Sequence, residues 1–238
     1  MTSEEFWQAE GLRFTFFYAD NAPPASRPTW EQLFGEPPVT RTERPAQHIV
    51  IEEGNWCDMT LTVASHPERV DVVAKEAGSS FSFPVIGPFE ASLQTFRSLV
   101  EKINLDDVVR VAFGAILLHS EDGMEGAYKT LGRLLPHIRL DADSREFFYQ
   151  INKPFDHLVE GVKSYKFNSL RRWAAVSLQQ INIDGETVHS KAVVASRLEL
   201  DVNSSPELDL TAIEGKTGEV LEAVISNALS IARGENNA

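Results

Sequence analysis

The sequence has very little cysteine and lacks any long hydrophobic run. Its single cysteine, Cys57, excludes an intramolecular disulfide, paired-cysteine redox motifs and zinc sites built from three or four cysteines of one chain. Such cysteine usage is typical of a reducing compartment. The longest apolar runs are much shorter than the roughly 20 residues that a membrane helix needs, and the first residues are acidic, unlike a secretory signal. We therefore expect a cytoplasmic protein without a membrane segment.

Positive charge is also scarce. The 238 residues hold 22 Lys and Arg against 35 Asp and Glu, a net charge of −13, which disfavours binding to nucleic-acid backbones. The 42% hydrophobic and 24% charged residues are ordinary for a globular protein and argue against extensive disorder. Neither a Gly-x-Gly-x-x-Gly motif nor a complete phosphate-binding loop occurs, so we expect no nucleotide cofactor.

Known catalytic and metal-binding patterns are missing as well. No two of the six histidines stand four residues apart, so no helical metal-ligand pair exists, and we expect no metal. Cys57, at the start of an expected strand, is interpreted as a small buried residue. The nearest approach to an active site is His119 with Glu121, which would need a distant acid such as Asp143 to converge on it. A hydrolase or nuclease-like enzyme using His119 and carboxylates is therefore the alternative to a protein that is not an enzyme.

Hydrophobic periodicity predicts two halves, residues 1–140 and 141–238, that form one compact unit. In the first half, hydrophobic residues that alternate with polar ones predict strands, and hydrophobic residues three and four positions apart predict helices. Residues 21–45 form a proline-rich loop, which is the best candidate for a segment that binds a partner. Three of the strands should form an antiparallel meander, with residues 53–55 as a turn. The expected elements are a strand at 12–18, a helical turn at 30–34, strands at 48–52, 57–63 and 70–75, a helix at 88–103, a strand at 108–119 covered on both faces, and a helix at 124–137.

The second half should contain a strand at 147–151, a long hairpin of residues 170–183 and 188–202, and a closing helix at 215–232. Asp184-Gly185 supplies the tight turn of the hairpin, and a change of parity predicts a bulge at Gln179-Gln180. Leu170 and Ala174 are expected to face the core, whereas Glu199 and Asp201 on the partner strand, like Arg13 on the first strand, are expected to face away from it. Together these elements predict an α+β fold with a largely antiparallel sheet and three main helices packed on one face. The similar order of strands and helix in each half suggests a duplication.

The order of these elements is similar to that of a known group of proteins. Residues 96–103, 109–114 and 197–202, with the order of strands and helices around them, resemble an uncharacterised, sporadically distributed bacterial protein family of unknown function. The resemblance implies the same arrangement of strands and helices. It implies no catalytic residues, because none are assigned in that family.

Residues 131–197 form the one basic stretch, with ten basic and seven acidic residues. Within it, one strand face should expose a basic–aromatic patch that can bind phosphate, single-stranded nucleic acid or an acidic protein surface. The alternative is a solvated strand face whose arginines pair with Glu199 and Asp201 across the hairpin. The basic–aromatic patch consists of Lys163, Lys166, Arg171, Arg172 and Trp173.

These observations favour a non-enzymatic, cytoplasmic binding or accessory protein that acts through a protein partner. A third class, a sensor that encloses a small ligand between sheet and helices, would have a large apolar cavity instead. The sequence leaves the partner and the oligomeric state open.

Overall fold

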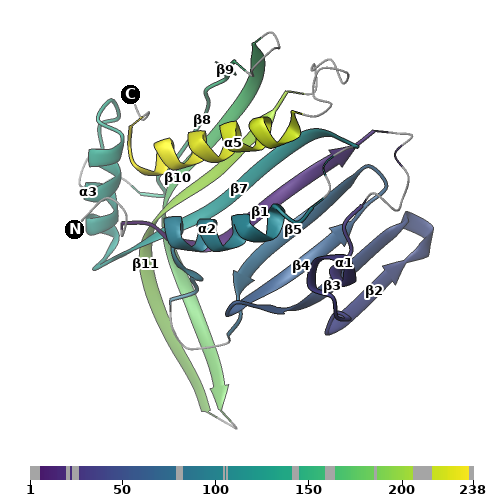
Figure 1. Cartoon of the computed structure of the whole chain (residues 1–238). Coiled ribbons are helices and arrows are strands. Elements are labelled where there is room, and N and C mark those ends of the chain that lie inside the picture. The colour runs from purple at the N-terminus through teal and green to yellow at the C-terminus, as the bar shows by residue number, and fades with distance from the viewer. Residues whose placement is uncertain are drawn as a thin grey trace.

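A computed structural model describes residues 6–19, 22, 27–78, 83–103, 105, 107–140, 145–158, 164–184, 187–205 and 216–235. These residues form one antiparallel sheet of eleven strands, in the order β2-β3-β4-β5-β1-β7-β11-β10-β8, with β6 beside β1 and β9 beside β10 (Figure 1). The strands are β1 (Gln8–Tyr18), β2 (Thr40–Arg44), β3 (Ile49–Trp56), β4 (Met59–Ser65), β5 (Arg69–Glu76), β6 (Gly87–Pro88), β7 (Val108–Glu121), β8 (Phe148–Asn152), β9 (Phe155–His157), β10 (Tyr165–Asp184) and β11 (Thr187–Ser204).

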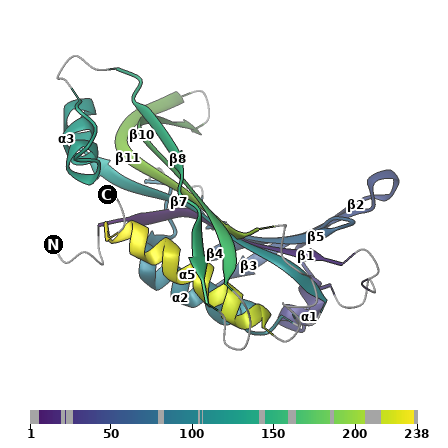
Figure 2. The same ribbon diagram turned by 90° about the horizontal axis from the view of Figure 1, so that it is seen from above.

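Two long helices, α2 (Phe89–Val100) and α5 (Thr217–Ala232), lie side by side on the same face of this sheet, as Figure 2 shows from above. A third, α3 (Met124–Leu134), contacts β10 and β11 at one end of the sheet. The molecule is therefore an α+β structure with an open antiparallel sheet. It stays a prediction that all three helices pack on one face and that the chain consists of two similar halves.

The core fills the space between α2, α5 and the sheet. The predicted alternation of β1 is confirmed, because Leu12, Phe14, Phe16 and Tyr18 are all buried. The Phe14 ring stacks on Phe96 of α2 at 5.0 Å and lies 5.0 Å from Phe113 of β7. Phe96 is 0% exposed, so the predicted apolar stripe of this helix does pack on the sheet. The same is true of α5, whose Val220, Leu221, Val224, Ile225, Ala228 and Ile231 are buried.

The predicted meander is confirmed as β3-β4-β5, but its first turn lies elsewhere. Cys57 and Asp58 form that turn with φ values of 48° and 60°, so the strand begins at Met59 and Cys57 is exposed rather than buried. Gly54, predicted in the turn, lies within β3. A Cβ atom there would be 2.3 Å from Cζ2 of Trp30, so the indole of Trp30 packs directly over the glycine backbone.

Trp30 belongs to the helical turn α1 (Trp30–Phe34), which the sequence predicted within the proline-rich loop. Thr29 and Gln32 form a capping box at its start. Strand β2, from the same loop, was not predicted. It pairs with β3 and forms one edge of the sheet.

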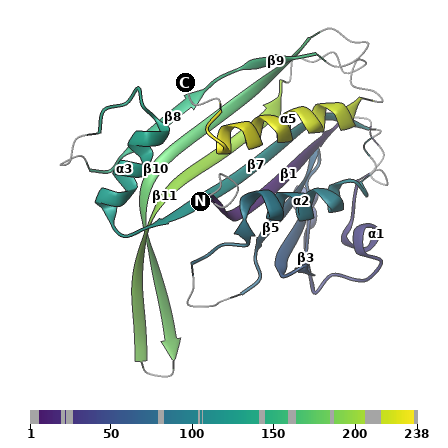
Figure 3. The same cartoon turned by 60° about the vertical axis from the view of Figure 1, so that its left-hand side comes forward.

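The long hairpin of β10 and β11 is confirmed, with Leu170 opposite Asp201 and Ile183 opposite Val188. Its register runs without a shift, so the predicted bulge at Gln179-Gln180 is wrong. Gly185 of the predicted turn lies outside the residues that the structure describes. Figure 3 shows the far part of the hairpin extending beyond the other strands.

Strand β7 lies at the centre of the sheet, between β1 and β11. One of its faces is covered by α5, as expected of a central strand. The prediction that both faces are covered is confirmed only in part, because on the other face Ala112 and Leu118 are buried whereas Gly114 and Ile116 line a pocket. We call this side, away from α2 and α5, the open face.

Candidate functional site

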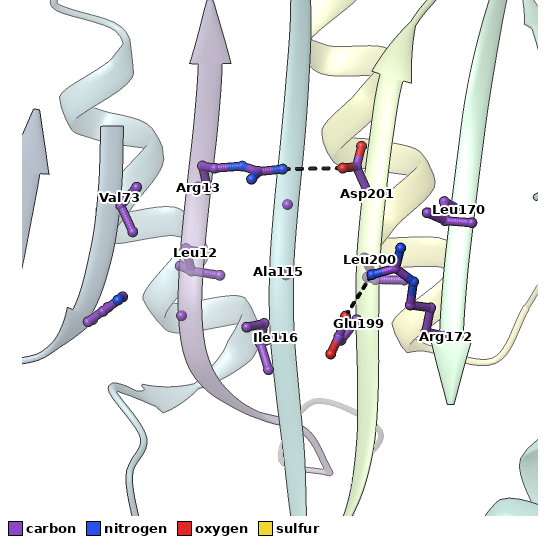
Figure 4. A pocket seen from close by; sticks show the side chains of 13 residues that line it. Leu12, Arg13, Val73, Ala115, Ile116, Leu170, Arg172, Glu199, Leu200 and Asp201 are labelled. Atoms are coloured by element: carbon purple, nitrogen blue, oxygen red, sulfur yellow. Dashed lines mark hydrogen bonds and ion pairs between the residues drawn. The ribbon is translucent and has the colours of Figure 1, made fainter. Parts of the chain in front are cut away.

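The register of the sheet aligns side chains in rows across the open face. In one row, Arg13 of β1, Gly114 of β7 and Asp201 of β11 lie directly opposite one another. The guanidinium of Arg13 reaches over the glycine, and its Nη2 lies 3.2 Å from Oδ2 of Asp201 (Figure 4). A Cβ atom on Gly114 would lie 3.3 Å from that nitrogen, so the glycine leaves the arginine room to cross the strand.

The neighbouring row carries a second ion pair. It contains Gly11, Ile116, Glu199 and Arg172, from strands β1, β7, β11 and β10. Nη1 of Arg172 lies 3.2 Å from Oε2 of Glu199, while Nε donates to Gln150 at 2.7 Å. Arg197 holds the other oxygen of the Glu199 carboxylate at 2.9 Å. Two guanidinium groups therefore fix the Glu199 carboxylate in place.

A pocket of about 370 Å³ lies between these two ion pairs. Its floor contains two glycines on adjacent central strands, Gly11 and Gly114, where the absence of side chains leaves space above the sheet backbone, part of which the Arg13 guanidinium occupies over Gly114. Apolar side chains flank this floor and charged ones stand around it (Figure 4). The pocket is lined by Gly11, Leu12, Arg13, Val73, Lys75, Gly114, Ala115, Ile116, Leu170, Arg172, Glu199, Leu200 and Asp201.

Beside the pocket, Glu10 occupies a position where the register of β1 against β7 shifts, between Ala9 and Gly11. Burial raises the pKa of its carboxyl group, an effect that the nearby Arg197 opposes and Glu199 reinforces. Among the described residues, the buried atoms Oε2 of Glu10 and Nε of Arg197 have no hydrogen-bond partner. The open face therefore holds desolvated polar groups next to the pocket.

The structure divides the basic–aromatic patch between the two faces of the sheet. Arg171 and Trp173 are 4% and 1% exposed, so the prediction that they share an exposed face is wrong. They do lie on one face, but it is the covered one, because they pair with Leu200 and Leu198 of the core. Burial lowers the pKa of Arg171, whose Nε lies 3.3 Å from the Ser169 hydroxyl. Arg171 is therefore part of the packed interior and not of a binding surface.

The other members of the patch do not join into one surface. Lys166 is exposed on β10, and Lys163 lies outside the described residues. Arg172 is on the open face with Leu170 and Ala174, which were expected to face the core. The cross-strand alternative is confirmed for Arg172, which pairs with Glu199, whereas Asp201 pairs with Arg13.

The structure brings His119 and Glu121 together, although not in an open site. Nε2 of His119 lies 3.9 Å from Oε1 of Glu121, and its Nδ1 is 3.0 Å from the carbonyl oxygen of Phe6, whose ring stacks on the imidazole. The same Glu121 oxygen accepts a hydrogen bond of 2.8 Å from the Ser196 hydroxyl, which is 0% exposed. Ser196 therefore cannot reach a substrate. Asp143 lies outside the described residues.

Within the described part of the chain, no group of three or more His, Cys, Asp and Glu residues is arranged to hold a metal ion. No helix in that part is both long enough and apolar enough to cross a membrane.

Part of the open-face site could be predicted from the sequence. Alternation placed Arg13, Glu199 and Asp201 on strand faces away from the core. The pocket itself was missed, because its floor depends on Gly11 and Gly114 becoming neighbours, and strands β1 and β7 are separated by some ninety residues. No local pattern signals that pairing.

Comparison with known proteins does not assign a function to this site. No protein-family model matches the chain, and no curated protein matches it either. Membership of the bacterial family that the chain resembles stays a prediction.

Proposed function

We propose that the protein is a non-enzymatic binding or accessory protein that holds a segment of a protein partner on the open face of its sheet. The pocket over Gly11 and Gly114 is the contact point. The observation that carries the proposal is this glycine floor between two ion pairs, Arg13 with Asp201 and Arg172 with Glu199. Glycines within strands often mark places where a ligand or another backbone approaches closely.

The composition of the pocket suits a polypeptide partner. Val73, Ile116 and Leu170 offer apolar contact area for one inserted side chain, and the charged groups around them can exchange their present partners for groups of the incoming chain. The pocket opens to the outside on the face opposite α2 and α5. A ligand bound there is not enclosed between sheet and helices, which favours a protein segment over the small-ligand sensor.

The carboxylates and His119 give the enzyme alternative less support. Arginine side chains form ion pairs with Glu199 and Asp201, and Glu121 accepts a hydrogen bond from the buried hydroxyl of Ser196. Groups held in this way can position neighbours, but a general acid or base has to reach a substrate. The open face, by contrast, is accessible.

Site-specific photo-cross-linking in cells of the source organism tests the proposal. A photoreactive amino acid at Leu170 or Ile116 should give a cross-linked product with the same single protein. Placed at Glu101, whose side chain is 64% exposed beyond the end of α2, the same group should not give that product. The absence of a product at both pocket positions, or equal products at all three, would contradict the proposal.

A further inference from the structure

The two edges of the sheet differ in how they are protected against pairing with another chain. At one edge, β2 is short and fully exposed, and three of its five residues are charged: Arg41, Glu43 and Arg44. Charged side chains and short edge strands are common devices against edge-to-edge association. The β2 edge is therefore protected.

The other edge, along β10, has no such protection. Strand β8 pairs with β10 only as far as Phe148, opposite Ala174. Before β8, Glu146 adopts a φ of 54° and turns the chain away, so no strand in the described part of the molecule pairs with residues 175–178 on that side. The sequence between Arg172 and Asp184 contains no charged residue and no proline. Phe148, where the covered edge stops, is 62% exposed.

The hairpin is also long for a two-stranded structure. Strand β7 stops pairing with β11 at Val194, opposite Ser177, and among the described residues no third strand pairs with the hairpin beyond that point. Figures 1 and 3 show this part, residues 178–184 and 187–193, extending away from the rest of the sheet. We call this part, together with the adjoining residues 175–177, the arm. Isolated two-stranded hairpins are marginally stable in water, and a third strand stabilises them.

Hydrogen bonds at the base of β10 show which backbone groups of the arm point outward. Ser169 donates its N–H to the Asn152 side chain, and its carbonyl accepts from Lys153, both on the β8 side. The carbonyl of Lys166 accepts instead from Ser205, on the β11 side. Because the register has no shift, odd-numbered residues continue to face outward, which places the N–H and C=O of Ala175 and Ser177 on the unprotected edge.

We propose that this edge pairs with the same edge of a second copy of the chain, which makes the protein a homodimer joined through its arms. The two β10 strands run antiparallel about a two-fold axis perpendicular to the sheet, with Ser177 of one copy opposite Ile183 of the other, which leaves Ala174 paired with Phe148. In this register outward-facing residues meet outward-facing residues, and each copy's arm continues the line of the other's β8, past the exposed Phe148.

The distribution of charge determines where a second copy can bind. Each chain carries a net charge of −13, so two copies repel each other over most of their surfaces. The uncharged run between Arg172 and Asp184 is where two identical strands can meet without opposing like charges. Because the arm extends from the sheet, this contact also keeps the two acidic bodies apart. The interface is isologous and closes on itself, so it leaves no free edge for further association.

Analytical ultracentrifugation of the full-length chain over a range of concentrations tests the proposal. The unmodified protein should sediment as a dimer. Ser177→Pro removes an outward N–H and leaves the ladder with β11 intact, since the inward groups of β10 belong to even-numbered residues. Each dimer loses two hydrogen bonds by symmetry, so the dissociation constant should rise by about 30-fold.

Ser177→Ala is the matched control, because it keeps the N–H and should remain dimeric. Ser177→Lys, which introduces a charge at an exposed position of the edge, should also weaken the dimer, and it keeps the test valid if the proline variant does not fold. Far-ultraviolet circular dichroism checks folding of each variant. A monomer at every concentration of the unmodified chain would overturn the proposal, as would a dimer that a folded Ser177→Pro or Ser177→Lys variant leaves equally strong.

Discussion

Arg13 and Asp201 form an ion pair of 3.2 Å although a whole strand separates them, because the residue between them on that strand is Gly114. The two side chains are 44% and 38% exposed, so the pair contributes little to folding. Because the pair borders the pocket, the proposed function gives it a role in binding instead.

Asp201→Asn should therefore lower the free energy of unfolding by no more than about 1 kcal/mol, the usual range for exposed pairs. The variant should nevertheless reduce cross-linking of the partner from Leu170. Urea titration measures the first effect and the yield of cross-linked product measures the second. A large loss of stability with unchanged cross-linking would show that the ion pair is structural.

Arg171 and Arg172 are neighbours in sequence and should respond in opposite ways to charge reversal. Arg171→Glu places an uncompensated charge in the core and should cost roughly 3–5 kcal/mol, whereas Arg172→Glu, on the open face, should cost about 1 kcal/mol or less. Thermal and urea unfolding of the two variants provides the comparison. Equal stability of the two would mean that β10 presents its other face to the core.

Phe96 anchors α2 on the sheet through Phe14. Truncation by Phe96→Ala should lower the free energy of unfolding by about 3–5 kcal/mol, because the side chain is fully buried. Gln94→Ala, two residues away on the exposed side of the same helix, is the control and should change stability by less than about 0.5 kcal/mol. A loss under about 1 kcal/mol for Phe96→Ala would contradict the packing of this helix.

Glu10 makes stability depend on pH with a defined sign. Burial raises its pKa in the folded protein above the ordinary value of 4.5, so ionisation at higher pH destabilises the fold, and this penalty disappears as the pH falls through the raised pKa towards 4.5. Glu10→Gln should therefore raise the melting temperature at pH 7 and lose that advantage below pH 4.5. Melting curves of both proteins across this range test it. A variant that is less stable at pH 7 would show that the Glu10 carboxylate is stabilised by its neighbours.

Local periodicity predicted most helices and strands, and it failed where distant parts of the chain decide the outcome. The alternation of residues 170–176 showed that Arg171 and Trp173 share a face, but both faces carry apolar residues, so composition pointed to the wrong one. Arg171 lies on the covered face because it pairs with Leu200 of β11, and this pairing between strands cannot be derived from local periodicity. Likewise, Gly54 resembles a turn residue until Trp30, 24 positions earlier, is seen to pack on it.

The pocket also depends on strand pairing that local periodicity does not predict. Arg13, Glu199 and Asp201 were correctly placed away from the core because strand period is local. That Arg13 meets Asp201 follows from the strand order β1-β7-β11, which brings together residues from opposite ends of the chain. Sequence periodicity contains no information about that order.

The most direct test of the central claim, that the glycine floor of the open face receives the partner, is to fill that floor. Gly114→Val adds a side chain beneath the flexible guanidinium of Arg13, which can move aside, so the fold should persist. Gly132→Val, on α3 at a glycine with open space around it, is the matched control. With a photoreactive group at Leu170, the yield of the partner cross-link should fall at least tenfold in Gly114→Val and stay unchanged in Gly132→Val. An unchanged yield in a folded Gly114→Val protein would contradict the claim.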